Sequence, residues 1–334
     1  MTGPLAGRRG LLATLATLAS GALAATSRTS ATAPATYPAH TVRIVVPYAV
    51  GIGPDVVARG IAKHLARRWG QAVIVDNKPG ASGIVAFGDV RRTAADGHTL
   101  YLADTATLAV NPLLHSRLPY DPVRDLVPLT LLFHATFVLW VGGRNRLRSI
   151  AELQTAARRE AESISYGSLG NGHASHVAIE SYARAACLRL LHVPFKDAGS
   201  LFTAVAAGDV DLTAFSMNSL AGLMAAGRVR PLAVAARRRL ASHPEIPTLV
   251  EAGGPAVEMH PWAALMALAG TPAPVLAQLQ HDITAVMAQP EVHRLGAQTG
   301  FEITPSSPQG LRDRIAADIA AYRPLVDEGR VARL

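Results

Sequence analysis

The sequence predicts an α/β protein in which two halves of similar design are joined by two apolar crossings. From Thr41 onward, short β-rich runs alternate with amphipathic helical stretches, a pattern typical of parallel sheets covered by helices on both faces. The pattern starts again near residue 163, after a long apolar run, and a second apolar run follows Pro261. With 334 residues, 49% of them hydrophobic and 17% charged, the chain is long enough for two domains with separate cores.

The first half opens with a strand, a helix and a second strand. Residues 42–46 form a β-branched run, and Pro54 suits the first position of the following helix because proline has no N–H group to satisfy there. One apolar stripe runs along that helix, Gly70 ends it, and residues 72–75 predict the next strand. This order indicates a βαβ unit.

The second half repeats the same order of elements. The expected strands cover residues 163–167, 188–193, 210–215 and 232–235, and the expected helices cover residues 175–186, 200–207 and 220–226. Two apolar runs, residues 129–141 and 262–268, predict the crossings between the halves, with a break at His134 in the first. Helices that begin near residue 272 and cover residues 309–331 complete the chain. Because the chain leaves and returns, we expect these helices to pack on the first half.

The first 35 residues are typical of an export signal followed by a linker. Arg8 and Arg9 precede a stretch without charge up to Arg28, and residues 22–24 have the small-x-small spacing of a cleavage site. Thr, Ser and Gly dilute this stretch, which falls short of the run of about 20 apolar residues that a membrane span requires. Residues 7–12 resemble a twin-arginine signal, with general secretion as the alternative. We therefore expect a cleaved signal peptide and a periplasmic protein.

Composition and charge exclude several classes of protein. The formal net charge is +8, but the basic residues are scattered and aromatic residues make up only 5% of the chain. This pattern does not fit a nucleic-acid-binding surface. The single cysteine, Cys187, excludes an internal disulfide and a cysteine-based metal cluster, and we expect it to be a buried thiol on a helix.

A glycine-rich turn, Gly51-Ile52-Gly53-Pro54-Asp55, lies between the first strand and its helix. Backbone N–H groups and the helix dipole favour an anion at such a position. A dinucleotide-binding turn is the more specific alternative, because Asp76 ends the next strand about where an acid that binds the ribose would lie. However, Val56 occupies the third glycine position, and an exported protein has no supply of NAD. A carboxylate or another small anion is the preferred interpretation, and a purely structural turn is the remaining one.

A second glycine-rich turn covers residues 167–176 in the other half. Two such turns in two halves predict that each directs amide donors at one ligand held between them. Metal binding by His173 and His176 is an alternative, but no third ligand at a supporting spacing is visible in the sequence. A serine hydrolase using Ser168 or Ser175 with a nearby histidine is the other alternative. It requires a serine–histidine contact of about 3 Å and an acid that orients the imidazole.

Short phrases in a fixed order point to a family. They are Tyr37-Pro38, Ile44-Val45-Val46-Pro47-Tyr48, Asp76-Asn77-Lys78-Pro79-Gly80-Ala81-Ser82-Gly83, Asp96-Gly97-His98-Thr99-Leu100, Asn111-Pro112, Leu118-Pro119-Tyr120-Asp121-Pro122, Gly170-Asn171-Gly172 with Ser175-His176, His192-Val193-Pro194-Phe195-Lys196, Gly208-Asp209-Val210-Asp211, Pro247-Thr248 and Ala269-Gly270-Thr271-Pro272. Over residues 37–330 the chain resembles the Bug-type periplasmic solute receptors of tripartite tricarboxylate transporters. Each phrase alone is unspecific, but their order and spacing are specific.

The resemblance implies a type II periplasmic-binding (Venus flytrap) fold of two α/β domains joined by two crossover strands. We expect domain 1 at residues 37–134 plus 262–334 and domain 2 at residues 135–261. The resemblance also implies a small carboxylate ligand, membrane transporter subunits as partners, and no enzyme activity, cofactor or metal. We expect the protein to be a monomer. The ligand-binding positions carried over are Tyr48, Ala49, Gly51, Ile52, Gly53 and Asp55 in the first turn (residues 48–55), Ser168, Gly170, Asn171, Gly172, His173 and Ser175 in the second turn (residues 168–175), and Phe215 and Ser216 at the pocket wall.

The chain departs from the family pattern in both turns. The family usually has Pro-Pro-Gly-Gly-Gly-Thr-Asp at residues 49–55 and threonine in place of His173. Pro54 removes a hydroxyl and an N–H donor, and Ile52 adds bulk where the backbone approaches the ligand. His173 adds an imidazole that the helix dipole biases toward the neutral form and that a bound carboxylate favours as the cation. We therefore expect tighter carboxylate binding near pH 6 than near pH 8, and we expect His173→Thr to flatten that dependence.

Overall fold

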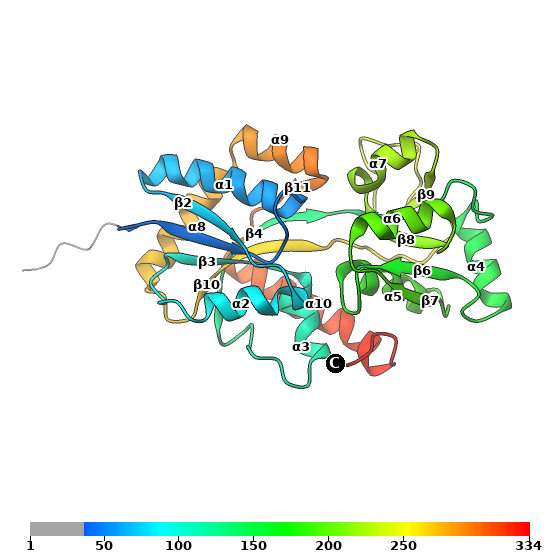
Figure 1. The fold of residues 1–334 in the computed structure, drawn as a ribbon, viewed down its shortest axis with the longest axis horizontal. Coiled ribbons are helices and arrows are strands. Elements are labelled where there is room, and N and C mark those ends of the chain that lie inside the picture. The colour runs from blue at the N-terminus through cyan, green and yellow to red at the C-terminus, as the bar shows by residue number, and fades with distance from the viewer. Residues whose placement is uncertain (1–36) are drawn as a thin grey trace, which may run out of the picture. The chain divides into compact units, whose positions relative to one another are not determined.

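Two sheets organise residues 37–334, which are the residues that the computed structural model describes (Figure 1). The predicted signal peptide and linker at residues 1–35 lie outside the described residues. Helices cover both faces of each sheet, so the predicted α/β architecture is confirmed. Within residues 37–334, no helix has the length and apolar character that a membrane span requires.

The first sheet has six strands in the order β11-β4-β10-β3-β1-β2. Its strands are β1 (Val42–Val46), β2 (Val73–Asn77), β3 (Thr99–Asp104), β4 (Leu126–Ala135), β10 (Trp262–Leu268) and β11 (Phe301–Ile303). β1 runs parallel to β2 and β3, whereas β10 pairs antiparallel with β3 and β4. The sheet is therefore mixed.

Alternate side chains of β1 enter two different cores of this sheet. Val42, Ile44 and Val46 pack under α1 (Gly53–Trp69) and α8 (Ala273–Met287). Helix α9 (Pro290–Thr299) covers the same face of the sheet. Val45 faces the opposite core. That core is covered by α2 (Ile84–Val90), the π-helical segment Ala106–Val110 and α10 (Pro308–Asp327), with the 3₁₀ turn Ala81–Gly83 and α3 (Asn111–Leu114) beside them.

The second sheet has five strands in the order β7-β6-β8-β5-β9. These are β5 (Phe137–Gly142), β6 (Ser165–Ser168), β7 (Leu191–Pro194), β8 (Leu212–Ser216) and β9 (Val229–Val234). One face packs on α4 (Ile150–Arg159) and α5 (Ala174–Ala185), and the other packs on α6 (Ala198–Ala207) and α7 (Met217–Ala225).

The chain passes between the sheets at two adjacent places. After β4 it continues through Thr136 directly into β5 of the second sheet, and it returns through the segment that precedes β10. The two crossings are hydrogen-bonded to each other, since Ala135 N–H donates to Pro261 O (2.8 Å) and Phe137 N–H donates to Met259 O (3.0 Å). We keep the predicted domain bounds, 37–134 plus 262–334 and 135–261, as a proposal.

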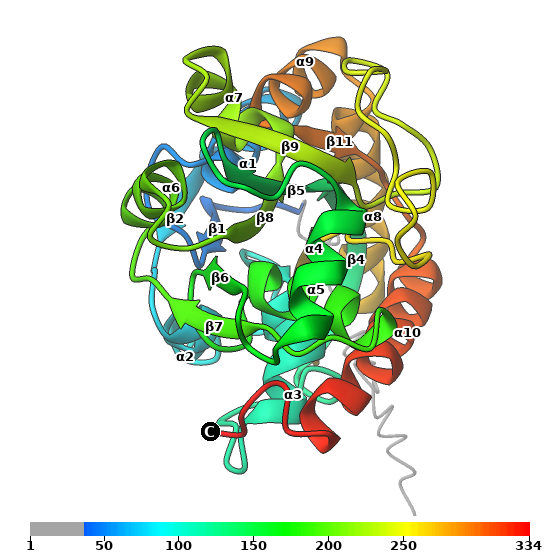
Figure 2. The ribbon, with the colours of Figure 1, turned by 90° about the vertical axis from the view of Figure 1, so that its right-hand side faces the viewer.

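The C-terminal helices return to the first sheet, as predicted. α8 and α9 pack on α1, and α10 packs on β4 and on the π-helical segment. The end of α10 also reaches α5 of the second sheet (Figure 2). The last seven residues, 328–334, follow α10 as a C-terminal tail that contacts both α5 and the loop after α3.

The structure corrects four details of the sequence prediction. Both sheets are mixed rather than parallel, because the crossing strands enter each sheet in the reverse direction. The last helix ends at Asp327, followed by Gly329 with a positive φ of 69°. The sequence prediction leaves out helix α9, although Pro290 opens it and Gly300 ends it, and strand β11, whose three residues are too few to show an alternation. Cys187 is exposed rather than buried, because it follows the last turn of α5 with a positive φ of 53°.

Candidate ligand-binding site

A cavity of about 350 Å³ lies where the first turn, the crossings and the helix starts of the second sheet meet. Its lining residues are Tyr48, Ile52, Gly53, Pro54, Phe133, Ala135, Phe137, Leu169, His173, Ala174, Ala198, Phe202, Phe215, Ser216, Ser219, Pro261, Trp262, Ala263, Thr299 and Phe301. They come from both sheets. A separate groove of about 400 Å³ between residues 122–128 and α10 contains none of the predicted site residues.

The structure brings both predicted turns to this one cavity. Six predicted residues line it, namely Tyr48, Ile52, Gly53, His173, Phe215 and Ser216. The other eight stand outside the lining, namely Ala49, Gly51, Asp55, Ser168, Gly170, Asn171, Gly172 and Ser175. Several of these eight have side chains that face the protein and hold the turns in shape, so they act on the cavity indirectly.

Asp55 holds the first turn from behind. Its carboxylate is 1% exposed and accepts hydrogen bonds from Gly51 N–H (2.8 Å), Asn77 Nδ2 (2.8 Å) and Arg59 Nε (3.0 Å). Burial alone would raise the pKa of Asp55, but these donors outweigh it and hold the pKa below its ordinary value. The ionised carboxylate thus ties the glycine at the tip of the turn to β2 and to α1.

Four helices begin at the wall of the cavity. The lining includes Gly53, Ala174 and Ala198, the first residues of α1, α5 and α6, and also Ser216, which precedes α7. Ile52 stands at the N-cap of α1 and forms no side-chain cap. Each helix start carries a partial positive charge. The lining contains no Lys, Arg, Asp or Glu, so the helix starts dominate the electrostatics of the cavity.

His173 lines the cavity as a neutral imidazole. Its Nδ1 accepts a hydrogen bond from Ser175 N–H (3.1 Å), which leaves the proton on Nε2. Burial lowers the pKa of His173 to about 4, and the nearby Asp104 carboxylate opposes the shift only in part. The buried ring is therefore neutral near pH 6 in the free protein, and the expected tighter binding at that pH requires a bound carboxylate to raise this pKa.

Tyr48 is the other titratable side chain of the lining. Its hydroxyl donates to the Asp104 carboxylate, which also accepts from Thr107 N–H (2.8 Å). Burial, and then the Asp104 charge, raise the pKa of Tyr48 well above its ordinary value. The phenol therefore stays protonated and presents its ring to the cavity.

Buried serines and histidines support the second turn. Ser168 is 0% exposed, and its hydroxyl lies 2.6 Å from His192 Nε2. The His192 ring stacks on the His176 ring with centroids 3.8 Å apart, and His176 Nδ1 accepts from Gly172 N–H (3.1 Å). Burial lowers the pKa of His192 to about 4 and that of His176 to about 3. The stack is thus a neutral support beneath the turn.

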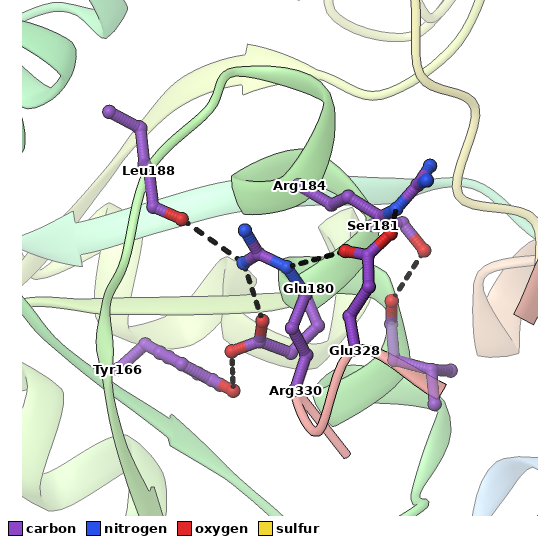
Figure 3. Close-up of polar contacts among 8 residues, drawn as sticks. Tyr166, Glu180, Ser181, Arg184, Leu188, Glu328 and Arg330 are labelled. Carbon is purple, nitrogen blue, oxygen red and sulfur yellow. Dashed lines mark hydrogen bonds and ion pairs between the residues drawn. The ribbon is translucent and has the colours of Figure 1, made fainter. Parts of the chain in front are cut away.

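The C-terminal tail holds the second turn from the other side. Asn171 Nδ2 donates to Ala332 O (2.7 Å), and Arg330 Nη1 contacts Glu180 Oε2 (3.3 Å) and donates to Leu188 O (3.1 Å) (Figure 3). Glu180 also accepts from the hydroxyl of Tyr166 at 2.6 Å. The last residues of the chain therefore tie α5, which starts at the cavity, to the end of α10.

The geometry does not support the hydrolase alternative. The Ser168–His192 contact, and a 2.9 Å contact between Ser175 Oγ and His173 Nδ1, meet the distance requirement. However, both serines are 0% exposed, and neither His173 nor His192 has a carboxylate hydrogen-bond partner among the residues that the structure describes. These contacts therefore hold the turn rather than activate a nucleophile.

Potential metal ligands gather away from the cavity. Among residues 37–334, the one group of three such side chains close enough to hold an ion is His40, Asp96 and His98. It lies at the start of β1 and β3, at the opposite end of these strands from the first turn. The rings of His40 and His98 stack with centroids 3.7 Å apart, which suits packing rather than two ligands directed at one ion.

Sequence reasoning missed most of the aromatic lining. Phe133, Phe137, Phe202, Phe301 and Trp262 come from five separate elements, and no local pattern links them. Three of them, Phe133, Phe137 and Trp262, lie in the predicted crossings. Because a crossing runs between the two halves, its side chains could have been expected to line a cavity there.

Comparison with known proteins identifies the family. The model described as "Tripartite tricarboxylate transporter family receptor" matches residues 57–330. The chain belongs to this family. A relative from Pseudomonas sp., the "UPF0065 protein in tcbD-tcbE intergenic region", is 33% identical over 296 residues, 88% of this chain and 88% of the relative. Protein BugT of Bordetella pertussis is 28% identical over 294 residues, 88% of this chain and 90% of BugT.

Solved structures of similar receptors share the fold. An R. palustris protein with adipate is 29% identical with a TM-score of 0.80, and the match covers 89% of this chain and 100% of that chain. MatC of Rhodopseudomonas palustris with bound malate is 27% identical with a TM-score of 0.76, and the match covers 86% of this chain and 99% of that chain. The fold is thus that of the periplasmic binding proteins, and the protein is a Bug-type solute receptor, not an enzyme.

Proposed function

We propose that this receptor captures a small carboxylate in the 350 Å³ cavity and presents it to the membrane subunits of a tripartite tricarboxylate transporter. Two similar receptors have structures with adipate and with malate, and both ligands are carboxylates. The proposal includes export to the periplasm through a cleaved leader at residues 1–35, by the twin-arginine or the general route, and function as a monomer.

The observation that carries the proposal is the convergence of four helix starts on a cavity without charged side chains. Helix starts favour anions, and they act more strongly where water is excluded. In this proposal the carboxylate lies between Gly53 of the first turn and the Nε2–H group of His173 in the second turn. Ser216 and Ser219, whose hydroxyls lie 2.9 Å apart, complete the polar side.

The proposal assigns direct contact to the six predicted residues that line the cavity. Tyr48, Phe215 and Ile52 form its wall, and Gly53, His173 and Ser216 supply polar groups. The other eight predicted residues hold the two turns in place. Binding and turn geometry are therefore separate properties that different substitutions affect.

Calorimetry and thermal unfolding of the purified protein against a carboxylate panel test the proposal. A ligand present at 100 times its Kd stabilises the folded state by about 2.7 kcal/mol, which raises the melting temperature by a few degrees. Matched neutral amides serve as controls, because they keep the shape and remove the charge. Absence of binding by every carboxylate in the panel would contradict the proposal.

A glycine pair provides a site-directed test. A Cβ added at Gly53 would lie 2.7 Å from the Phe301 ring at the cavity wall, whereas a Cβ added at Gly88 of α2 meets no atom within 4 Å. We expect Gly53→Ala to weaken carboxylate binding and Gly88→Ala to leave it unchanged. Equal binding by the two variants would place the ligand elsewhere.

A further inference from the structure

The cavity is lined mainly by aromatic side chains. The chain has seven phenylalanines, and five of them line this cavity together with Tyr48 and Trp262. We call these five, Phe133, Phe137, Phe202, Phe215 and Phe301, the aromatic wall. In a chain with only 5% aromatic residues, their concentration around one cavity indicates that the body of the ligand is apolar.

The aromatic wall has two parts that come from different sheets. Phe133 of β4 stacks on Phe301 of β11 with ring centroids 4.3 Å apart. On the other side, Phe215 packs against Phe202 at 4.9 Å with the rings nearly perpendicular, and against Phe137 at 5.7 Å. A flat aromatic ligand in the cavity would meet faces and edges of these rings, which is the arrangement that aromatic groups prefer.

The polar groups of the cavity suit one carboxylate and not two. The helix starts, the Nε2–H group of His173 and the two serine hydroxyls can receive one anion. No Lys or Arg lines the cavity, and the Tyr48 hydroxyl already donates to Asp104. The phenyl rings that make up most of the remaining lining offer no partner to a second carboxylate, and desolvation of an unpaired charge is strongly unfavourable.

The size of the cavity sets the number of rings. An engineered apolar cavity of about 150 Å³ holds one benzene molecule. The cavity here measures about 350 Å³, which leaves room for a carboxylate on one ring or on two fused rings.

We propose that this receptor selects an aromatic monocarboxylate of one or two rings over dicarboxylates and tricarboxylates. The inference rests on the proposed function and narrows its ligand class. It distinguishes this chain from the similar proteins with adipate and malate, whose ligands carry two carboxylates.

Calorimetry with four matched probe pairs tests each part of the inference. Hexanoate against adipate, and benzoate against terephthalate, test the second carboxylate. Benzoate against cyclohexanecarboxylate tests the aromatic ring, and benzoate against benzamide tests the anion. We expect the monocarboxylate to bind at least about tenfold more tightly in each charge pair. We expect benzoate to exceed cyclohexanecarboxylate about threefold to tenfold.

Leucine variants connect the preference to the aromatic wall. Phe202 and Phe301 are half-buried, so Phe202→Leu and Phe301→Leu are expected to fold. Each should weaken benzoate binding about threefold to tenfold and leave hexanoate binding within about twofold. Phe195 is equally half-buried in the second half but does not line the cavity, so Phe195→Leu should change neither.

Each outcome bears on one of the two proposals. Adipate or terephthalate binding as tightly as its monocarboxylate partner would overturn this inference and leave the proposed function intact. Equal loss of benzoate binding in Phe195→Leu and Phe202→Leu would overturn the role of the aromatic wall. Binding of benzamide as tight as that of benzoate, or no carboxylate binding at all, would overturn the proposed function itself.

Discussion

The first and second turns both connect a strand to a helix that begins at the cavity, yet different chemistry holds each in shape. A single ionised side chain, Asp55, holds the first turn through three donors. Neutral histidine rings and the C-terminal tail hold the second. The same backbone geometry can therefore rest on one buried charge or on several uncharged contacts, and the two solutions should respond differently to mutation and to pH.

The largest expected effect is the loss of the Asp55 carboxylate. Asp55→Ala leaves Gly51 N–H, the Asn77 amide and the Arg59 guanidinium without their acceptor, so we expect a loss of about 2–4 kcal/mol in the free energy of unfolding. Chemical denaturation measures this. Arg59→Ala is the control and should cost about 1 kcal/mol or less, because the Arg59 side chain is 46% exposed. Similar losses in the two variants would show that Asp55 stabilises the protein mainly through its ion pair with Arg59 and not through its hydrogen bonds to the turn.

Removal of the Arg330 side chain tests the support of the second turn. Burial raises the pKa of Glu180, and hydrogen bonds from Tyr166 and Arg330 oppose that shift. In Arg330→Ala the buried Glu180 carboxyl keeps only its hydrogen bond from the Tyr166 hydroxyl among the contacts described above. We therefore expect a loss of about 2–3 kcal/mol in the free energy of unfolding. The control Arg333→Ala breaks an exposed ion pair with Asp327 and should change the free energy of unfolding by less than about 0.5 kcal/mol. If Arg330→Ala matches Arg333→Ala in urea titrations, the tail does not support the turn.

The two turns should lose stability in different pH windows. The pKa values of His173, His176 and His192 are lowered from 6.5 to about 4, 3 and 4, so the native protein keeps them neutral where the unfolded chain binds protons. The free energy of unfolding should therefore fall as the pH drops from 6.5 toward 4. The contribution of Asp55, whose pKa lies below 3.8, should be lost only at still lower pH.

A single variant separates these windows. His176→Asn keeps an acceptor for Gly172 N–H and removes one titrating ring. The slope of unfolding free energy against pH should decrease by up to about 1.4 kcal/mol per pH unit near pH 5. An unchanged slope would mean that His176 is protonated in the folded protein.

The smallest expected effect is a nearly constant affinity between pH 6 and pH 8. The pKa of His173 is about 4 in the free protein, so benzoate affinity should vary by less than about twofold over this range as long as the bound carboxylate raises that pKa by less than about two units. His173→Thr should weaken binding through loss of the Nε2–H donor, by about threefold to tenfold, without a change in the pH profile. Calorimetry at the two pH values measures both. Tighter binding at pH 6 that disappears in His173→Thr would restore the cationic role expected from the sequence.

Local order and the position of both turns were predictable from the sequence, because their determinants are local. β1 and β10 begin and end where the apolar runs do. Gly70 and Gly208 end helices in the left-handed conformation that glycine adopts without strain. The series of family phrases likewise identified the receptor family, since phrase order is a property of the sequence alone.

The tertiary structure alone decided which side chains face the ligand cavity. Asp55 belongs to a recognisable turn, but its carboxylate points away from the cavity because Asn77, 22 residues later, returns beside it in β2. The aromatic wall joins residues from Phe133 to Phe301, and the tail residue Ala332 reaches Asn171 across 161 positions. Such contacts depend on the path of the whole chain across two sheets. Hydrophobic periodicity and capping signals reach only one or two helical turns along the sequence, so they carry no information about that path.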